Sequence, residues 1–289
     1  MGRVMIEAFS YSQDLFFIAL FFFGLIIGSF LNVVIFRLPE ILNTRWREDC
    51  IHFLEKALEK ETTNFSLTKP GSHCPKCKAL IRPWENIPVF SYIFLRGRCK
   101  TCSKRISLRY PIVELLTAIL TLYLGFYFGI SRELLPALVL TWSLIVLSFI
   151  DFDHHLLPDD ITLPLLWLGL LVNTYSIFAS LESAVFGAFL GYGILWLVYW
   201  IFKLATGKDG MGFGDFKLLA ALGAWLGWES IPSIILMASV TGAVIGVSQM
   251  MIQKLSKETP IPFGPYLASA GMLILLSQGK NNLLTEILF

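Results

Sequence analysis

Long apolar runs are the feature of this sequence that most constrains its fold. Eight of them recur along the 289 residues, and about 20 apolar residues are enough for a helix to cross a hydrocarbon core of about 30 Å. Only 15% of the residues are charged, whereas soluble domains carry roughly a quarter. The sequence therefore predicts an all-α polytopic membrane protein with about eight transmembrane helices. The expected helices cover about residues 13–36, 111–129, 134–150, 161–179, 184–203, 215–229, 232–252 and 262–278.

The first apolar run is expected to be a retained helix rather than a removable signal peptide. Glu7 and Asp14 precede it, and it ends in Arg37 and Pro39. A signal peptide would instead begin with a basic segment and end at a small-residue cleavage site.

Basic residues are concentrated in one segment, which fixes the expected orientation. Residues 37–110 hold 15 of the 23 Lys and Arg residues. Loops on the cytosolic side carry an excess of these residues. With the N-terminus outside, the basic segment lies inside and only Arg3, Arg132 and Lys280 remain outside. We therefore expect a multi-pass protein of the cytoplasmic membrane in this orientation.

This basic segment separates the first two expected spans. We expect residues 1–37 to hold the first transmembrane helix and residues 38–110 to form a small cytosolic insertion. Within the insertion, residues 45–61 combine mixed charges with scattered apolar positions, which is typical of an amphipathic surface helix. Residues 253–289 are expected to hold the C-terminal transmembrane helix.

Glycines recur in the last third of the chain. Gly187 and Gly191 are four residues apart on one expected helix, and Gly242 and Gly246 on another. This spacing places two glycines on one helix face and predicts close helix packing.

Four of the five cysteines form two Cys-x-x-Cys pairs, Cys74 with Cys77 and Cys99 with Cys102. Paired thiolates at this interval are typical of zinc ribbons, and thiols in the cytosol stay reduced. The pattern predicts a structural zinc site, because four protein ligands leave no open position for a catalytic water. The alternatives are a redox pair or unrelated thiols. Cys50 is expected to be an ordinary free cysteine.

Two acidic motifs lie at the expected membrane edge. Asp151 and Asp153 follow the third span, and Asp215 opens the sixth, both on the cytosolic side in the expected topology. Ionisable groups at membrane depth cost about 2.5–3.5 kcal/mol and usually carry function. Two carboxylates from separate helices can share one water: the ionised one removes a proton while the protonated one activates a peptide carbonyl. The motifs are compatible with such a catalytic dyad.

These aspartates also have purely structural interpretations. Asp159 and Asp160 precede an apolar run, which favours a helix N-cap. Asp153 is two residues from Asp151, so on a helix their side chains point about 200° apart. Geometry thus leaves open which of those two faces a cavity. Asp215 can equally be a favourable charge at a helix N-terminus, although three glycines before it favour a close backbone approach.

Taken in order, these motifs resemble those of the prepilin peptidases, or type IV leader peptidases, a family of integral membrane aspartyl proteases. The resemblance covers most of the chain and includes the cysteine quartet. The other matching segments are Gly28-Ser29-Phe30-Leu31-Asn32-Val33-Val34-Ile35-Phe36-Arg37-Leu38-Pro39, Arg109-Tyr110-Pro111-Ile112-Val113-Glu114, Asp151 to Asp159, Gly212-Phe213-Gly214-Asp215-Phe216-Lys217-Leu218 and Pro262-Phe263-Gly264-Pro265.

The resemblance implies two activities. Family members cut the leader from type IV prepilins or type II secretion pseudopilins after a Gly on the cytosolic side. Many then N-methylate the new N-terminal residue, commonly Phe, with S-adenosylmethionine. The resemblance assigns Asp151 and Asp215 as the catalytic pair, within a peptidase membrane domain over residues 134–252.

The resemblance also implies an N-terminal methylation region over about residues 20–130. No glycine-rich methyltransferase motif is visible there, so the residues that bind the methyl donor are unknown from the sequence. We expect them in the cytosolic insertion and at its junctions with the membrane, where Glu114 lies.

Two other functions fit parts of the sequence. A metal-ion transporter would use Asp151, Asp153, His154 and His155 as ligands. A presenilin-like intramembrane protease would place both aspartates deep inside apolar helices. Membrane lipid is the expected surrounding, and no feature indicates a nucleic-acid partner.

Overall fold

The computed structural model describes residues 13–53, 66–68, 71–253 and 262–277. The chain divides into two compact units, Met1–Phe126 and Tyr127–Phe289. Regular structure in the described residues is helical, and the only strand-like pairings there are two isolated bridges. The predicted all-α class is therefore confirmed.

Helices occur at all eight positions where spans are predicted. Five in the described residues are long and apolar enough to cross a membrane: α2 (Gln13–Phe53), α4 (Arg109–Phe128), α5 (Leu134–His154), α7 (Leu181–Thr206) and α9 (Ile231–Gln253). The other three, α6 (Asp159–Asn173), α8 (Phe213–Leu226) and α10 (Gly264–Ser277), have 15, 14 and 14 residues. They are shorter than the roughly 17–25 residues of a typical span, so the number of spans stays a prediction.

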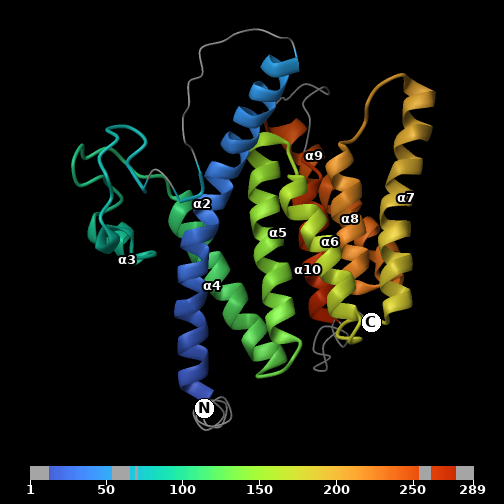
Figure 1. The fold of residues 1–289 in the computed structure, drawn as a ribbon, viewed down its shortest axis with the longest axis horizontal. Helices are drawn as coiled ribbons and strands as arrows, with labels where there is room; N and C mark the ends of the chain where they lie inside the picture. The colour runs from blue at the N-terminus through green and yellow to red at the C-terminus, as the bar shows by residue number, and fades with distance from the viewer. Residues whose placement is uncertain (1–12, 54–65, 69–70, 254–261, 278–289) are drawn as a thin grey trace. The chain divides into compact units, whose positions relative to one another are not determined.

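The first unit is built on α2 and α4, which pack together in antiparallel directions (Figure 1). Gly24 and Gly28 of α2 let its backbone touch α4 at Ala118 and Glu114. At the other end of α4, the rings of Phe17 and Phe126 stack with centroids 3.9 Å apart.

The first helix is longer than its sequence predicts. A span ending near residue 36 was expected, but α2 continues through Pro39 to Phe53. Proline in a helix interior costs about 3 kcal/mol or more, but the buried Leu38 and Leu42 on either side of Pro39 continue the packed face across it. The predicted amphipathic segment therefore begins inside α2, and its residues 54–61 lie outside the described part of the chain.

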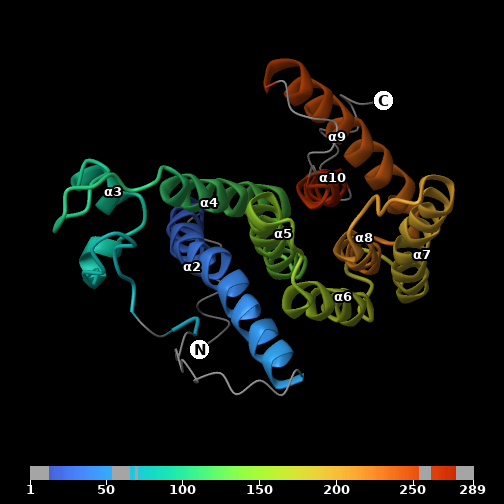
Figure 2. The ribbon, with the colours of Figure 1, turned by 90° about the horizontal axis from the view of Figure 1, so that it is seen from above.

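The second unit surrounds α8, whose side chains are almost all buried. Figure 2 shows α8 lying between α6 and α7, with α10 beside it. Gly187 and Gly191 of α7 face the backbone of α8 at Gly223 and Leu219, so the predicted glycine-mediated packing is confirmed there. A helix that is apolar all round is typical of a protein core or a membrane span, and α8 is covered by protein on most sides.

Polar contacts fix one end of α8 against α6. The amide of Asn173 donates to the carbonyls of Ala224 and Trp225 at 2.8 and 2.9 Å. The indole N–H of Trp225 in turn donates to the carbonyl of Leu165. The opposite end of the unit holds the α5–α6 and α7–α8 connections, at the top of Figure 1.

Candidate active site and metal centre

Asp151 lies in the last turn of α5 and is only 5% exposed. Its Oδ2 accepts a hydrogen bond from the backbone N–H of Gly264 at 2.9 Å. Gly264 is the first residue of α10, so the carboxylate meets the positive end of a helix, where anions are favoured.

Asp215 approaches from a different helix at the same end of the unit. It lies in the first turn of α8, is 8% exposed, and its backbone N–H donates to the carbonyl of Gly212. Gly214, next to Asp215, and Gly264, which contacts Asp151, both pack against Leu157. Two buried carboxylates from α5 and α8 are thus brought together.

Asp153 differs from Asp151 in its exposure. It is exposed, as are His154 and His155, whereas Asp151 is buried. This difference agrees with the helix geometry, which predicts that the two aspartates do not share one face. Helix α5 ends at His154 and is capped by His155, which adopts a left-handed conformation with φ 50° and donates its N–H to the carbonyl of Asp151.

These positions bear on both alternative functions. Among the described residues, the only group of three or more His, Cys, Asp or Glu residues that could hold a metal is the cysteine quartet. The cation site of the transporter hypothesis is therefore not formed. Asp151 and Asp215 lie in terminal helical turns, and not deep inside helices as a presenilin-like site would require.

The predicted N-cap role of Asp159 and Asp160 is wrong. The N-cap of α6 is Pro158, and both aspartates lie within the first helical turn. Asp159 instead binds Lys217 of α8, whose Nζ lies 2.6 and 2.7 Å from its two carboxylate oxygens. This ion pair joins the starts of α6 and α8.

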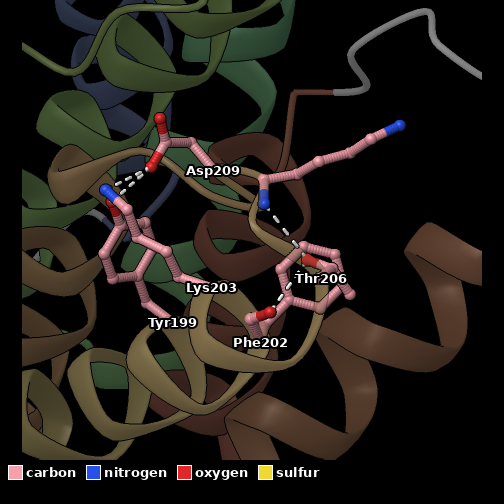
Figure 3. Close-up of polar contacts among 6 residues, drawn as sticks. Tyr199, Phe202, Lys203, Thr206 and Asp209 are labelled. Atoms are coloured by element: carbon pink, nitrogen blue, oxygen red, sulfur yellow. Dashed lines mark hydrogen bonds and ion pairs between the residues drawn. The ribbon is translucent and has the colours of Figure 1, made fainter.

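The loop that leads to Asp215 is held by a buried tyrosine (Figure 3). The hydroxyl of Tyr199 on α7 donates to Oδ1 of Asp209 at 2.6 Å, and Lys203 contacts the same oxygen at 2.8 Å. The Lys203 ammonium donates to this carboxylate and so lowers the pKa of Asp209. The ring of Tyr199 also contacts Phe213 and Phe216, which flank Asp215. No residue pattern in the sequence signals this arrangement.

Further contacts hold both ends of the same loop. The hydroxyl of Thr206 donates to the carbonyl of Phe202 and accepts from the N–H of Lys208 (Figure 3). Gly214 packs against Leu157, where an added Cβ would come within 2.7 Å of the leucine Cβ. The glycine next to Asp215 therefore allows the close backbone approach that the sequence predicts.

The four cysteines of the two pairs converge in the first unit. All four Sγ atoms lie within 4.8 Å of one another. Sγ of Cys74 is 3.9 Å from that of Cys102, and Sγ of Cys77 is 4.0 Å from that of Cys99. Zn–S bonds of about 2.3 Å in a tetrahedron require S···S separations of about 3.8 Å, so the quartet fits a tetrahedral metal.

The two cysteine pairs have the same local structure. In each, the N–H of the first cysteine donates across the turn, from Cys74 to Ala79 and from Cys99 to Lys104. The bridges His73–Leu80 and Arg98–Arg105 close the two turns. Because the repeated geometry aims the thiols inward, the spacing of the cysteines is explained by ligation of a common centre.

Nearby backbone amides favour the thiolate form of two members of this quartet, Cys74 and Cys99. The N–H groups of Cys77 and Lys76 donate to the sulfur of Cys74 and lower its pKa to about 6. Those of Cys102 and Thr101 lower the pKa of Cys99. The thiolate is the form of cysteine that binds a metal. Cys50 is exposed on α2 and outside the quartet, as predicted.

Sequence reasoning gave Gly264 no role in this site. The signal was present, because the Pro262 to Pro265 segment matches a motif of the family that the chain resembles. What the motif does becomes clear only when α10 is brought against the end of α5.

Two protein families match most of the chain. The bacterial peptidase A24 N-terminal domain matches residues 22–128, and the type IV leader peptidase family matches residues 138–247. Prepilin leader peptidase/N-methyltransferase of Stutzerimonas stutzeri is 54% identical over 253 residues, which cover 88% of each protein. The protein of the same name from Pseudomonas aeruginosa is 51% identical, over 88% of this chain and 87% of that protein. The one from Legionella pneumophila is 49% identical, over 87% of this chain and 88% of that protein. No solved structure matches the chain.

Proposed function

The chain belongs to the type IV leader peptidase family, and from this premise we propose that it processes prepilins in two steps. It cleaves the leader peptide of type IV prepilins or type II secretion pseudopilins after a Gly. It then N-methylates the new N-terminal residue, commonly Phe. The observation that carries the first step is the pair of buried carboxylates, Asp151 and Asp215, at one end of the second unit.

The two aspartates divide the work of peptide hydrolysis. Like charges at short range keep one proton between two carboxyl groups. The ionised group takes a proton from a water, which attacks the scissile carbonyl, and the protonated group donates to the carbonyl oxygen. The N–H of Gly264 on Asp151 and the α7–α8 loop before Asp215 orient the pair.

The cysteine quartet binds a structural zinc ion in this proposal. Cys74, Cys77, Cys99 and Cys102 supply all four ligands, with thiol separations close to those of a tetrahedral centre. Such a site leaves no coordination position for substrate, so the ion stabilises the insertion and takes no part in hydrolysis.

We place the dyad and the zinc insertion on the cytosolic side of the inner membrane, with the N-terminus outside. The support is the concentration of Lys and Arg in residues 37–110, which the positive-inside rule assigns to the cytosol. A prepilin with a basic leader has its scissile bond at that face, level with the ends of α5 and α8.

Methyl transfer uses S-adenosylmethionine, which supplies an electrophilic methyl group. The neutral α-amino nitrogen of the cleaved substrate forms the N–C bond as the C–S bond breaks, and the sulfur keeps the electron pair. The α-amino group has a pKa of about 7.7–8.0, so roughly a fifth to a third of it is neutral near physiological pH, and the attack needs no further oxidant or reductant.

The test uses the purified full-length protein in detergent with a prepilin-like substrate and S-adenosylmethionine. Mass spectrometry of the product should show a chain that begins directly after the Gly and carries one added methyl group at its N-terminus. An intact substrate would contradict the proposal, and cleavage without the added methyl would contradict its second step.

A further inference from the structure

The first unit contains a cavity of about 680 Å³ that hydrolysis does not use. Its volume lies in the range of roughly 300–1,000 Å³ that is typical of small-molecule sites. The walls come from α2, the two cysteine turns, the segment around Val89 and the start of α4. Aromatic and aliphatic side chains such as Phe36, Tyr92 and Tyr110 line it, together with the amide of Asn32.

A buried carboxylate lies on one wall of this cavity. Glu114 of α4 is only 8% exposed. The backbone N–H of Val89 donates to its Oε2 at 2.8 Å, and the hydroxyl of Ser29 is a second hydrogen-bond partner. Because Gly28 brings α2 against the Glu114 backbone, both helices fix the position of this carboxyl group.

The backbone that holds Glu114 is strained. Val89 has φ 58°, in the left-handed region that a β-branched residue rarely adopts. Strain of this kind persists where the surrounding structure over-determines it, and such positions cluster at ligand sites. Here the strained residue, Val89, is also the one whose N–H holds the Glu114 carboxyl group.

Basic side chains outnumber acidic ones among the charged residues of the lining. Lys76, Lys78, Lys104 and Arg105 face the cavity, and Lys100 does so while paired with Glu85 at 2.9 Å. A basic leader peptide would be repelled by this surface. The distribution instead suits a small ligand that carries a cationic centre for Glu114, a carboxylate for the basic side chains and a flat ring for the aromatic walls.

We propose that this cavity binds S-adenosylmethionine and that Glu114 is the residue that receives its cationic end. The inference rests on the proposed function, because it takes the methyl donor from that function. Sulfonium and α-ammonium groups are the cations of this ligand, its amino-acid carboxylate faces the basic residues, and its adenine contacts the aromatic side chains. This arrangement gives the methyl-transfer step a site in the first unit.

The experiment measures binding of S-adenosylmethionine to the full-length protein by titration calorimetry, for the wild type and Glu114→Gln. The glutamine keeps an oxygen for the Val89 N–H but removes the charge. We expect an affinity for S-adenosylmethionine at least tenfold lower and loss of methylation. Glu48→Gln is the matched control, because Glu48 is an exposed carboxylate on α2 outside the cavity lining. It should bind the donor normally.

Photo-crosslinking with S-adenosylmethionine gives a readout that does not depend on activity. Labelled peptides should contain cavity residues of 29–40 or 72–114. Wild-type affinity in Glu114→Gln, or a label confined to residues 127–289, would overturn the site while leaving the proposed function intact. A wild type that cleaves but neither binds the donor nor methylates would overturn the site together with the methyl-transfer step.

Discussion

The backbone N–H of Gly264 donates to Oδ2 of Asp151 at 2.9 Å, although the two residues are 113 positions apart. The start of α10 thereby meets the carboxylate at the end of α5. An added Cβ at Gly264 would come within 2.7 Å of the same oxygen. This contact requires glycine on one side and a carboxylate on the other.

Replacing Gly264 with alanine should therefore displace the Asp151 carboxylate. Misplacement of a reacting group by about 1 Å can cost on the order of 10²-fold in rate, so we expect Gly264→Ala to cleave a prepilin-like substrate far more slowly. Gly193→Ala is the control, because no atom lies within 4 Å of the Cβ it adds. Equal cleavage rates for the two variants would show that the contact does not position Asp151.

Removing the hydroxyl of Tyr199 should loosen the loop before Asp215. Tyr199→Phe keeps the ring that packs on Phe213 and Phe216 but loses the hydrogen bond to Asp209. We expect kcat for cleavage to fall by a few fold with zinc content unchanged. Thr174→Val is a suitable control for a lost exposed hydroxyl, and a kcat for Tyr199→Phe as high as that of the control would contradict the role of the loop.

The Asp209–Lys203 ion pair should stabilise the folded protein at neutral pH but not in acid. The hydrogen bond from Lys203 lowers the pKa of Asp209 below its unfolded value of about 3.9. The contribution of the pair is therefore complete above the unfolded pKa and is lost as pH falls through the folded pKa. Thermal unfolding of Asp209→Asn should occur below that of the wild type at neutral pH, and the gap should close below about pH 4. A difference in unfolding temperature that widens in acid would contradict this prediction.

Loss of one thiol should remove the metal without removing peptidase chemistry. We expect Cys99→Ser to hold much less zinc than the wild type and to unfold at lower temperature, because bound structural zinc contributes directly to folding. Cleavage by the protein that remains folded should persist. Cys50→Ser should keep its zinc, since Cys50 lies outside the quartet. Unchanged zinc in Cys99→Ser, measured by atomic absorption, would contradict the ligand set.

The local features of this protein were predictable from its sequence. Long apolar runs locate the helices, because each run must satisfy its own backbone hydrogen bonds in lipid. The spacing of Cys74, Cys77, Cys99 and Cys102 predicts their convergence, because each pair forms its own turn and the two turns share one centre.

Contacts between helices that are distant in the sequence were harder to predict. Asp159 precedes an apolar run as an N-cap would, but Lys217 from α8 lies close enough to bind it. Similarly, α2 continues through Pro39 because burial of Leu38 and Leu42 outweighs the local signal to stop. The roles of Gly264 and Tyr199 depend on which helix ends meet, and that information is not local.

The central claim is that Asp151 and Asp215 together hydrolyse the leader peptide bond. It is tested most directly by the cleavage rate of a prepilin-like substrate with Asp151→Asn, Asp215→Asn and Asp153→Asn, each checked for wild-type zinc content and thermal stability. We predict that the first two variants lose cleavage and that Asp153→Asn, which changes an exposed aspartate two residues away, retains it. Near-normal cleavage by Asp151→Asn or Asp215→Asn would contradict the account.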